Sequence, residues 1–144
     1  MTQALLPQFR ARGSGVIVNV TSSAVLAPFP LVAAYTASKT AIEGFTASLA
    51  QEMAALSLRV KLVQPGYGPS TSFTANGQER MQGLISAPYQ AFAQQCFAGL
   101  GQLSAVTEPG DVAQAVWNAV HDDTGRLHFP AGADALALAA ALAH

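Results

Sequence analysis

The pattern of apolar positions predicts two strands separated by one long helix. Val16–Val20 is a nearly continuous β-branched run, which is typical of a parallel strand buried on both faces of a sheet. A second strand is expected at Leu58–Gln64, where Pro65-Gly66 closes it. Between the two, residues 33–56 carry apolar side chains at spacings of three and four, the pattern of a helix with one buried stripe. The stripe consists of Ile42, Phe45, Leu49, Met53 and Leu56.

A strand, a helix and a second strand form a βαβ unit, in which the strands are parallel and the crossover is right-handed. Thr107 is the expected N-cap of a later helix, with Pro109 in its first turn. The remaining predicted elements are a helix over 2–11, that later helix to about residue 120, a strand over 126–129 and a helix over 133–143. The pattern as a whole predicts an α/β fold, a partial doubly wound (Rossmann-like) parallel sheet of about three strands with flanking helices.

Composition narrows the class of protein. The 144 residues suffice for one domain, and the net charge of −1 gives no reason to expect nucleic acid or an acidic membrane surface as a partner. Charged residues make up 10% of the chain, against about 25% in an ordinary soluble domain, and 51% are hydrophobic. We therefore expect much of the surface to face other protein, either a second subunit or a part of the same fold that is absent here.

Two further features bear on location. No apolar run reaches the ~18 residues of a membrane helix, and the N-terminus does not resemble a signal peptide. Cys96 is the single cysteine, which excludes an intrachain disulfide and suits a reducing compartment. We expect a cytoplasmic protein that does not associate with membranes.

Tyr35 and Lys39 are four residues apart on the long predicted helix, so they lie on one face, one turn from each other. An ammonium beside a phenol favours the phenolate, which suits a general acid/base. A Tyr-x-x-x-Lys pair by itself is also compatible with an ordinary helix that exposes its lysine and half-buries its tyrosine.

Ser22 makes the chemical interpretation stronger. It follows the Val16–Val20 strand, and Pro65-Gly66 follows the next strand. Ligands of open α/β sheets bind beyond the carboxyl ends of the strands. One crevice should therefore collect Ser22, the first turn of the long helix and Pro65-Gly66. The alternative for Ser22 is a serine that ends a strand with local hydrogen bonds.

Three motifs together resemble the short-chain dehydrogenase/reductase family. They are Asn19-Val20-Thr21-Ser22-Ser23, Tyr35-Thr36-Ala37-Ser38-Lys39 and Pro65-Gly66, in the family's order and at its intervals. The interval from Ser22 to Tyr35 singles out Ser22 over Ser23. The stretch Pro109–Val116 also resembles the family's late helix.

The resemblance implies a nicotinamide-dependent oxidoreductase that uses NAD or NADP on a carbonyl or alcohol substrate. It implies that Tyr35 is the acid/base, that Lys39 assists it and holds the nicotinamide ribose, and that Ser22 orients the substrate oxygen. It further implies that the segment 65–70 lies along the nicotinamide. The cofactor-binding residues it gives are Tyr35, Lys39, Pro65, Gly66, Gly68 and Ser70.

Residues 67–106 occupy the family's variable substrate region and would form a lid. Their aromatic and aliphatic side chains allow two interpretations of equal weight. They favour a moderately apolar substrate, or they simply pack the lid against itself.

The family's glycine-rich phosphate-binding turn, which follows a first strand, has no counterpart here. Gly13-Ser14-Gly15 precedes a strand, and Gly99-Leu100-Gly101 follows a helical stretch. We therefore expect residues 1–144 to be a single incomplete domain, the C-terminal catalytic and substrate-binding portion of the fold. Two functions remain open: the catalytic part of an oxidoreductase, or a truncated, non-catalytic remnant that only associates with other subunits. In either case a homo-oligomer is expected.

Overall fold

The computed structural model of the chain describes residues 1–143, so the expected domain end at His144 lies outside the described residues. Its three strands are β1 (Val16–Val20), β2 (Arg59–Pro65) and β3 (His128–Ala131). They form one parallel sheet in the order β1-β2-β3, with Ile17 opposite Val60 and Val63 opposite Phe129. The helices are α1 (Thr2–Arg12), η1 (Ser23–Val25), α2 (Ala33–Ala54), α3 (Ser72–Met81), η2 (Ala87–Tyr89), α4 (Gln90–Leu100), α5 (Pro109–His121) and α6 (Ala133–Leu142).

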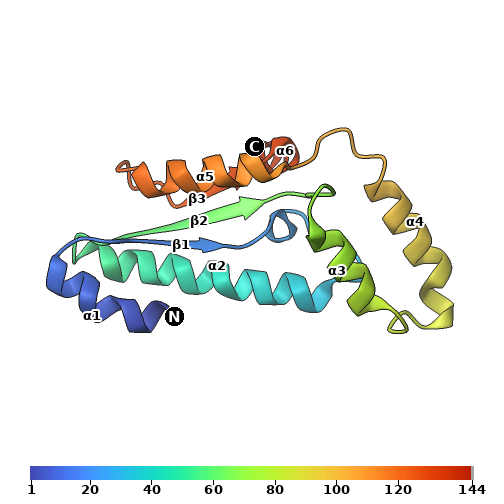
Figure 1. The fold of residues 1–144 in the computed structure, drawn as a ribbon, viewed down its shortest axis with the longest axis horizontal. Helices are drawn as coiled ribbons and strands as arrows, with labels where there is room; N and C mark the ends of the chain where they lie inside the picture. Colours follow the sequence, from blue (N-terminus) through green and yellow to red (C-terminus); the bar gives the residue numbers. More distant parts are fainter. Residues whose placement is uncertain (144) are drawn as a thin grey trace.

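The helices cover the sheet in layers (Figure 1). Helices α1 and α2 lie on one face, α5 lies on the other, and α6 packs against β3. Helices α3 and α4 extend away from the sheet, beyond the carboxyl ends of β1 and β2. The parallel α/β sheet of three strands that the pattern predicted is confirmed.

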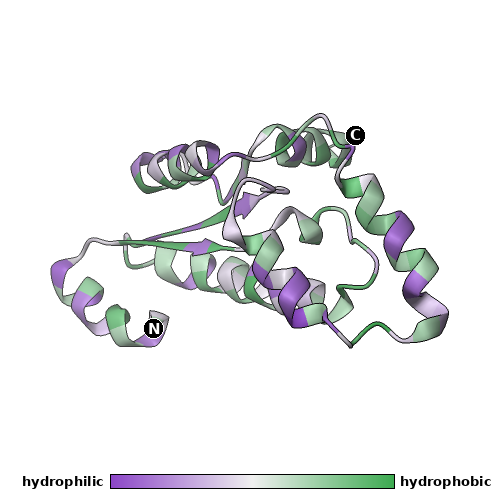
Figure 2. Ribbon diagram, turned by 45° about the vertical axis from the view of Figure 1, so that its right-hand side comes forward, coloured by the Kyte–Doolittle hydropathy of each residue, from purple (hydrophilic) through white to green (hydrophobic). Residues whose placement is uncertain are grey.

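Two apolar clusters hold these layers together, one on each face of the sheet. The α2 face buries Ile17, Leu49, Met53, Leu58 and Val60, with Leu6 and Phe9 of α1 packed against them. The α5 face buries Val63, Ala115, Ala119, Phe129 and Ala131. In Figure 2, β1 and β2 are largely apolar, with hydrophilic positions near their arrowheads.

The two predicted strands differ in burial. Residues 60–64 of β2 are buried, as expected for a strand with a neighbour on either side. In β1 only Ile17 is buried and Val20 is 44% exposed, so this apolar strand is less buried than β2. The reason is its position, because β1 is an edge strand with a single neighbour.

The predicted stripe of the long helix is also partly wrong. Leu49 and Met53 are buried, but Phe45 and Leu56 are 50% and 42% exposed. Thr46 takes the core position instead and is fully buried. Its hydroxyl accepts a hydrogen bond from Asn19 Nδ2 at 2.8 Å and donates one to the Ile42 carbonyl at 2.6 Å, which satisfies a polar group inside the core.

A buried ion pair ties β2 to the end of α5. Lys61 is 2% exposed, and its ammonium donates to Asp122 Oδ1 and to the Arg126 carbonyl, each at 2.7 Å. The Asp122 side chain, at the C-cap of α5, is 16% exposed. A lysine in the middle of an interior strand requires a partner, and Asp122 supplies it.

Among residues 1–143, no helix is both long enough and apolar enough to cross a membrane.

Candidate functional site

Tyr35 and Lys39 lie in the first two turns of α2, whose N-cap is Val32. The Lys39 Nζ atom is 5.7 Å from the centre of the Tyr35 ring. The same ammonium donates to the Val20 carbonyl at 3.4 Å, which links the start of α2 to the end of β1. The structure therefore brings the predicted pair together at the carboxyl edge of the sheet.

Ser22 lies two residues beyond β1 and caps η1 in an extended conformation. Its Oγ accepts a hydrogen bond from the Ala24 amide at 3.2 Å, as the local alternative for this residue anticipated. Within residues 1–143 the Ser22 hydroxyl proton has no acceptor, and the Tyr35 hydroxyl makes no hydrogen bond. Both hydroxyls are thus available to a ligand. Phe73 of α3 lies beside Tyr35, with 6.0 Å between the ring centres.

The predicted cofactor segment, residues 65–70, begins where β2 ends. The Gly66 amide donates to the Ala131 carbonyl and to Thr107 Oγ1, each at 3.1 Å. The Tyr67 amide donates to Asp134 Oδ2 at 2.6 Å. Two of the segment's main-chain donors are therefore occupied by the protein itself.

Gly68 and Ser70 differ in which of their hydrogen-bonding groups are bonded to the protein. The Gly68 carbonyl accepts from Thr71, while its amide has no acceptor within the described residues. The Ser70 hydroxyl donates to Glu108 Oε2 at 2.8 Å. Among the predicted cofactor contacts in this segment, the main-chain amides of Gly68 and Ser70 have no acceptor within the described residues, while the Ser70 hydroxyl fastens the segment to Glu108.

Sequence reasoning missed two residues that bind this segment. Thr107 is buried and contacts the Gly66 amide, and Asp134 contacts the Tyr67 amide. Thr107 was predicted as the N-cap of α5, which is wrong. Glu108 is the N-cap, and it forms a capping box with Asp111. The local pattern favoured Thr107 because threonine is a preferred N-cap residue and glutamate is not, and only the packing places the Thr107 side chain inward.

A second polar cluster, around Glu43 of α2, was also missed. Glu43 Oε1 accepts from the Thr21 hydroxyl at 2.5 Å and from Gln64 Nε2 at 3.1 Å, and its Oε2 lies 3.3 Å from His128 Nε2. Thr21 and Gln64 are buried, so Glu43 satisfies polar groups at the ends of β1 and β2. The Glu43 cluster holds α2 at a set position along the sheet, one turn beyond Lys39.

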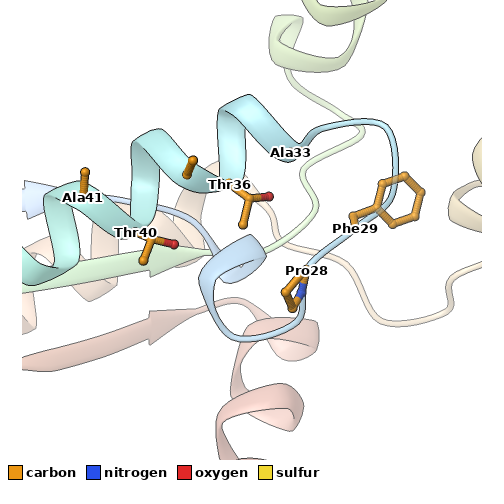
Figure 3. Close-up of a pocket in the computed structure, with 7 residues that line it drawn as sticks. Pro28, Phe29, Ala33, Thr36, Thr40 and Ala41 are labelled. Carbon is orange, nitrogen blue, oxygen red and sulfur yellow. The ribbon is translucent and has the colours of Figure 1, made fainter.

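Two pockets lie near this edge. One, of about 420 Å³, includes Glu43, Gln64, Arg126 and His128 in its lining. The other, of about 630 Å³, lies between the loop before α2 and one side of that helix (Figure 3). Its lining residues are Pro28, Phe29, Ala33, Thr36, Ala37, Thr40 and Ala41. Neither is lined by Ser22, Tyr35 or Lys39, so the candidate chemistry lies at an open edge outside both pockets.

The free groups at this edge match the requirements of a nicotinamide riboside. The Lys39 ammonium uses one hydrogen-bond donor at most on Val20, so others remain for ribose hydroxyls. The Gly68 amide suits a carboxamide oxygen. These residues could hold the nicotinamide end of a dinucleotide, which would supply hydride chemistry there.

Comparison with known proteins agrees with this geometry. The family model of the short chain dehydrogenases matches residues 1–82. The chain is 32% identical to an uncharacterized oxidoreductase of Schizosaccharomyces pombe over 131 residues, which cover 90% of this chain and 54% of that protein. The chain thus spans about half the length of this curated relative.

Solved structures give the same result. A short-chain dehydrogenase from Streptomyces avermitilis superposes with a TM-score of 0.73 at 28% identity, over 99% of this chain and 50% of the other. An NAD⁺-bound xylitol dehydrogenase superposes with a TM-score of 0.69 at 26% identity, over 91% of this chain and 53% of the other. The protein is therefore a member of the short-chain dehydrogenase family.

Proposed function

We propose that this protein is the catalytic part of an oxidoreductase that transfers hydride between a nicotinamide dinucleotide and a carbonyl or alcohol substrate. The observation that carries the proposal is the Tyr35–Lys39 pair at the carboxyl edge of the sheet, with a tyrosine hydroxyl that no protein group occupies. Family membership supports it.

In the direction of reduction, a dinucleotide held by these residues would supply hydride chemistry at the substrate carbonyl carbon. Tyr35 gives its hydroxyl proton to the carbonyl oxygen, so that the C=O π bond is replaced by a C–H and an O–H bond and an alcohol leaves. The Lys39 ammonium stabilises the negative charge that then develops on the Tyr35 oxygen. Ser22 donates a hydrogen bond to the reacting oxygen and fixes its direction. Oxidation of an alcohol runs through the same groups in reverse.

Either NAD or NADP is the proposed cofactor, held by Tyr35, Lys39, Pro65, Gly66, Gly68 and Ser70. The xylitol dehydrogenase with NAD⁺ bound is a structural neighbour at 26% identity, which supports a nicotinamide cofactor. Within this set, the Lys39 ammonium and the Gly68 amide are the proposed hydrogen-bond donors to the nicotinamide riboside, because the Gly66 amide and the Ser70 hydroxyl are already bonded to the protein.

Residues 67–106 are proposed as the substrate lid of this incomplete domain. They form α3, η2 and α4, which extend beyond the carboxyl ends of β1 and β2 (Figure 1). Phe73 places an apolar ring next to Tyr35, which favours a moderately apolar substrate.

We also propose a homo-oligomer in the cytoplasm. Apolar side chains stand exposed on several elements, among them Val20 on β1, Phe45 on α2 and Trp117 on α5 at 62% exposure. A surface of this kind, with few charges to oppose contact, favours association. The single cysteine, Cys96, suits a reducing compartment.

The test is an assay of the chain with NADH and with NADPH, each against a panel of aldehydes and ketones, in which loss of the reduced nicotinamide absorbance is followed. Turnover that depends on both the dinucleotide and the carbonyl compound is expected. Binding of neither dinucleotide by calorimetry, together with no turnover, would contradict the proposal and favour a non-catalytic chain that only associates with other subunits.

A further inference from the structure

Thr107 and Asp134 meet beneath the proposed cofactor segment, although they belong to different parts of the chain. Thr107 precedes α5 and Asp134 lies in the first turn of α6. Thr107 Oγ1 and Asp134 Oδ1 are 2.6 Å apart. Thr107 Oγ1 accepts a hydrogen bond from the Gly66 amide, and Asp134 Oδ2 accepts one from the Tyr67 amide. The Thr107 amide in turn donates to the Tyr67 carbonyl at 2.8 Å.

The hydrogen bonds around the Thr107 hydroxyl are strongly constrained. The oxygen accepts from the Gly66 amide and has two acceptors in reach, Asp134 Oδ1 and the Ala131 carbonyl at 2.9 Å. A hydroxyl carries one proton, so it serves both acceptors in turn or shares its proton between them. Thr107 is 3% exposed, and water therefore has little access to replace a lost partner.

Two glycines provide the space for this pair. A Cβ on Gly66 would collide with the Asp134 carboxylate, and a Cβ on Gly132 would collide with the Thr107 side chain. Gly132 also has a φ of +95°, a conformation that residues with a Cβ rarely adopt. The backbone at the ends of β2 and β3 is thus shaped around Thr107 and Asp134.

We propose that Thr107 and Asp134 are positioning residues for the nicotinamide end of the cofactor. They hold the main chain at Gly66 and Tyr67, so that the next amide, at Gly68, stays free for the carboxamide. The pair does not touch the cofactor and acts through the backbone of residues 66–68. The role in cofactor binding rests on the proposed function. The restraint that Thr107 and Asp134 place on the backbone does not depend on the proposed function.

The proposal is tested by substitutions at Thr107 and Asp134 that either remove or keep their hydrogen bonds to the main chain of residues 66 and 67. Thr107→Val keeps the shape of the side chain and removes the hydroxyl, whereas Thr107→Ser keeps the hydroxyl. Asp134→Ala removes both acceptors. Asp134→Asn keeps an acceptor for the Tyr67 amide and gains an N–H for Thr107, whose proton then goes to Ala131, so this variant should preserve the arrangement.

Two readouts are measured on the full chain: hydrogen exchange at the Gly66 and Tyr67 amides without cofactor, and the dissociation constants of NADH and NADPH. In Thr107→Val and Asp134→Ala, exchange at these amides should accelerate about tenfold or more, and the preferred dinucleotide should bind at least about tenfold more weakly. Thr107→Ser and Asp134→Asn should stay close to the parent protein in both readouts.

Thr46→Val is the matched control, because it removes the hydroxyl of a buried threonine in the core at a distance from the segment. It should lower stability without changing either readout. Unchanged exchange and affinity in Thr107→Val and Asp134→Ala would overturn the proposal, as would equal losses in Thr46→Val. If the parent chain binds neither dinucleotide, the proposed function fails and the cofactor role fails with it, whereas the exchange result still decides whether the pair restrains the backbone.

Discussion

The Lys39 ammonium lies between two groups of the candidate site, 5.7 Å from the centre of the Tyr35 ring and 3.4 Å from the Val20 carbonyl oxygen. The contact with Val20 fixes the lysine against the end of β1. A positive charge is thereby held beside the phenol, at the edge of the sheet where Ser22 also lies.

Tyr35→Phe should abolish turnover and leave dinucleotide binding largely unchanged, because it keeps the ring and removes only the transferable proton. A loss of about 10²-fold or more in kcat is expected for a missing acid/base. Steady-state kinetics and a dinucleotide titration measure the two effects separately. Ser48→Ala is the control, since it removes an exposed hydroxyl from the same helix, α2, at a position outside both the site and the proposed lid. Undiminished rates in Tyr35→Phe would remove the acid/base assignment.

Lys39→Ala should impair both turnover and dinucleotide binding, because it removes the charge beside Tyr35 and the proposed ribose contact. Loss of a charged hydrogen bond predicts about tenfold or more weaker binding. Lys39→Met keeps the apolar stem and serves as the companion variant. Equal defects in both would assign the effect to the ammonium, and normal binding in Lys39→Met would refute the ribose contact.

Stability at acid pH should depend on Asp122. Its hydrogen bond from the Lys61 ammonium holds the pKa of Asp122 below the ordinary value of 3.8. A carboxyl with a lowered pKa in the folded state stabilises the fold above its unfolded pKa, and this contribution is lost as the pH falls through the folded pKa. The melting temperature should therefore decline below about pH 4.

Asp122→Asn should have a lower melting temperature at neutral pH, because the buried Lys61 loses its counter-charge, and a shallower decline below about pH 4. Asp123→Asn is the adjacent control, since Asp123 is exposed and forms no salt bridge within residues 1–143. An identical acid decline in the parent protein and Asp122→Asn would show that the ion pair does not contribute.

The β1 edge should promote self-association of the chain. An exposed strand edge carries unpaired backbone groups, and a lysine on it opposes pairing. Val16→Lys should shift the sedimentation profile toward smaller species. Leu136→Lys adds the same charge on α6, where Leu136 is 54% exposed, and should have no such effect. A parent chain that is already a stable monomer would contradict this expectation.

Local sequence determined most of the βαβ unit and half of the candidate site. The β-branched run at Val16–Val20 predicts a strand because those side chains fit an extended backbone, and the 3.6-residue period alone puts Tyr35 and Lys39 one turn apart. Ser22 followed from the rule that strand ends gather ligands. These features depend on neighbours close in the chain, and the structure preserves them.

The tertiary structure alone decided which polar groups enter the core. Asp134 contacts the Tyr67 amide across 67 positions of sequence, and Lys61 reaches Asp122 across 61. No period or motif encodes such pairs, since they arise where separate helices meet the same sheet. The same packing turned Thr107 inward in place of capping α5 and exposed Phe45. Propensity selects helix or strand at each segment, whereas burial is set by neighbours that only the folded chain provides.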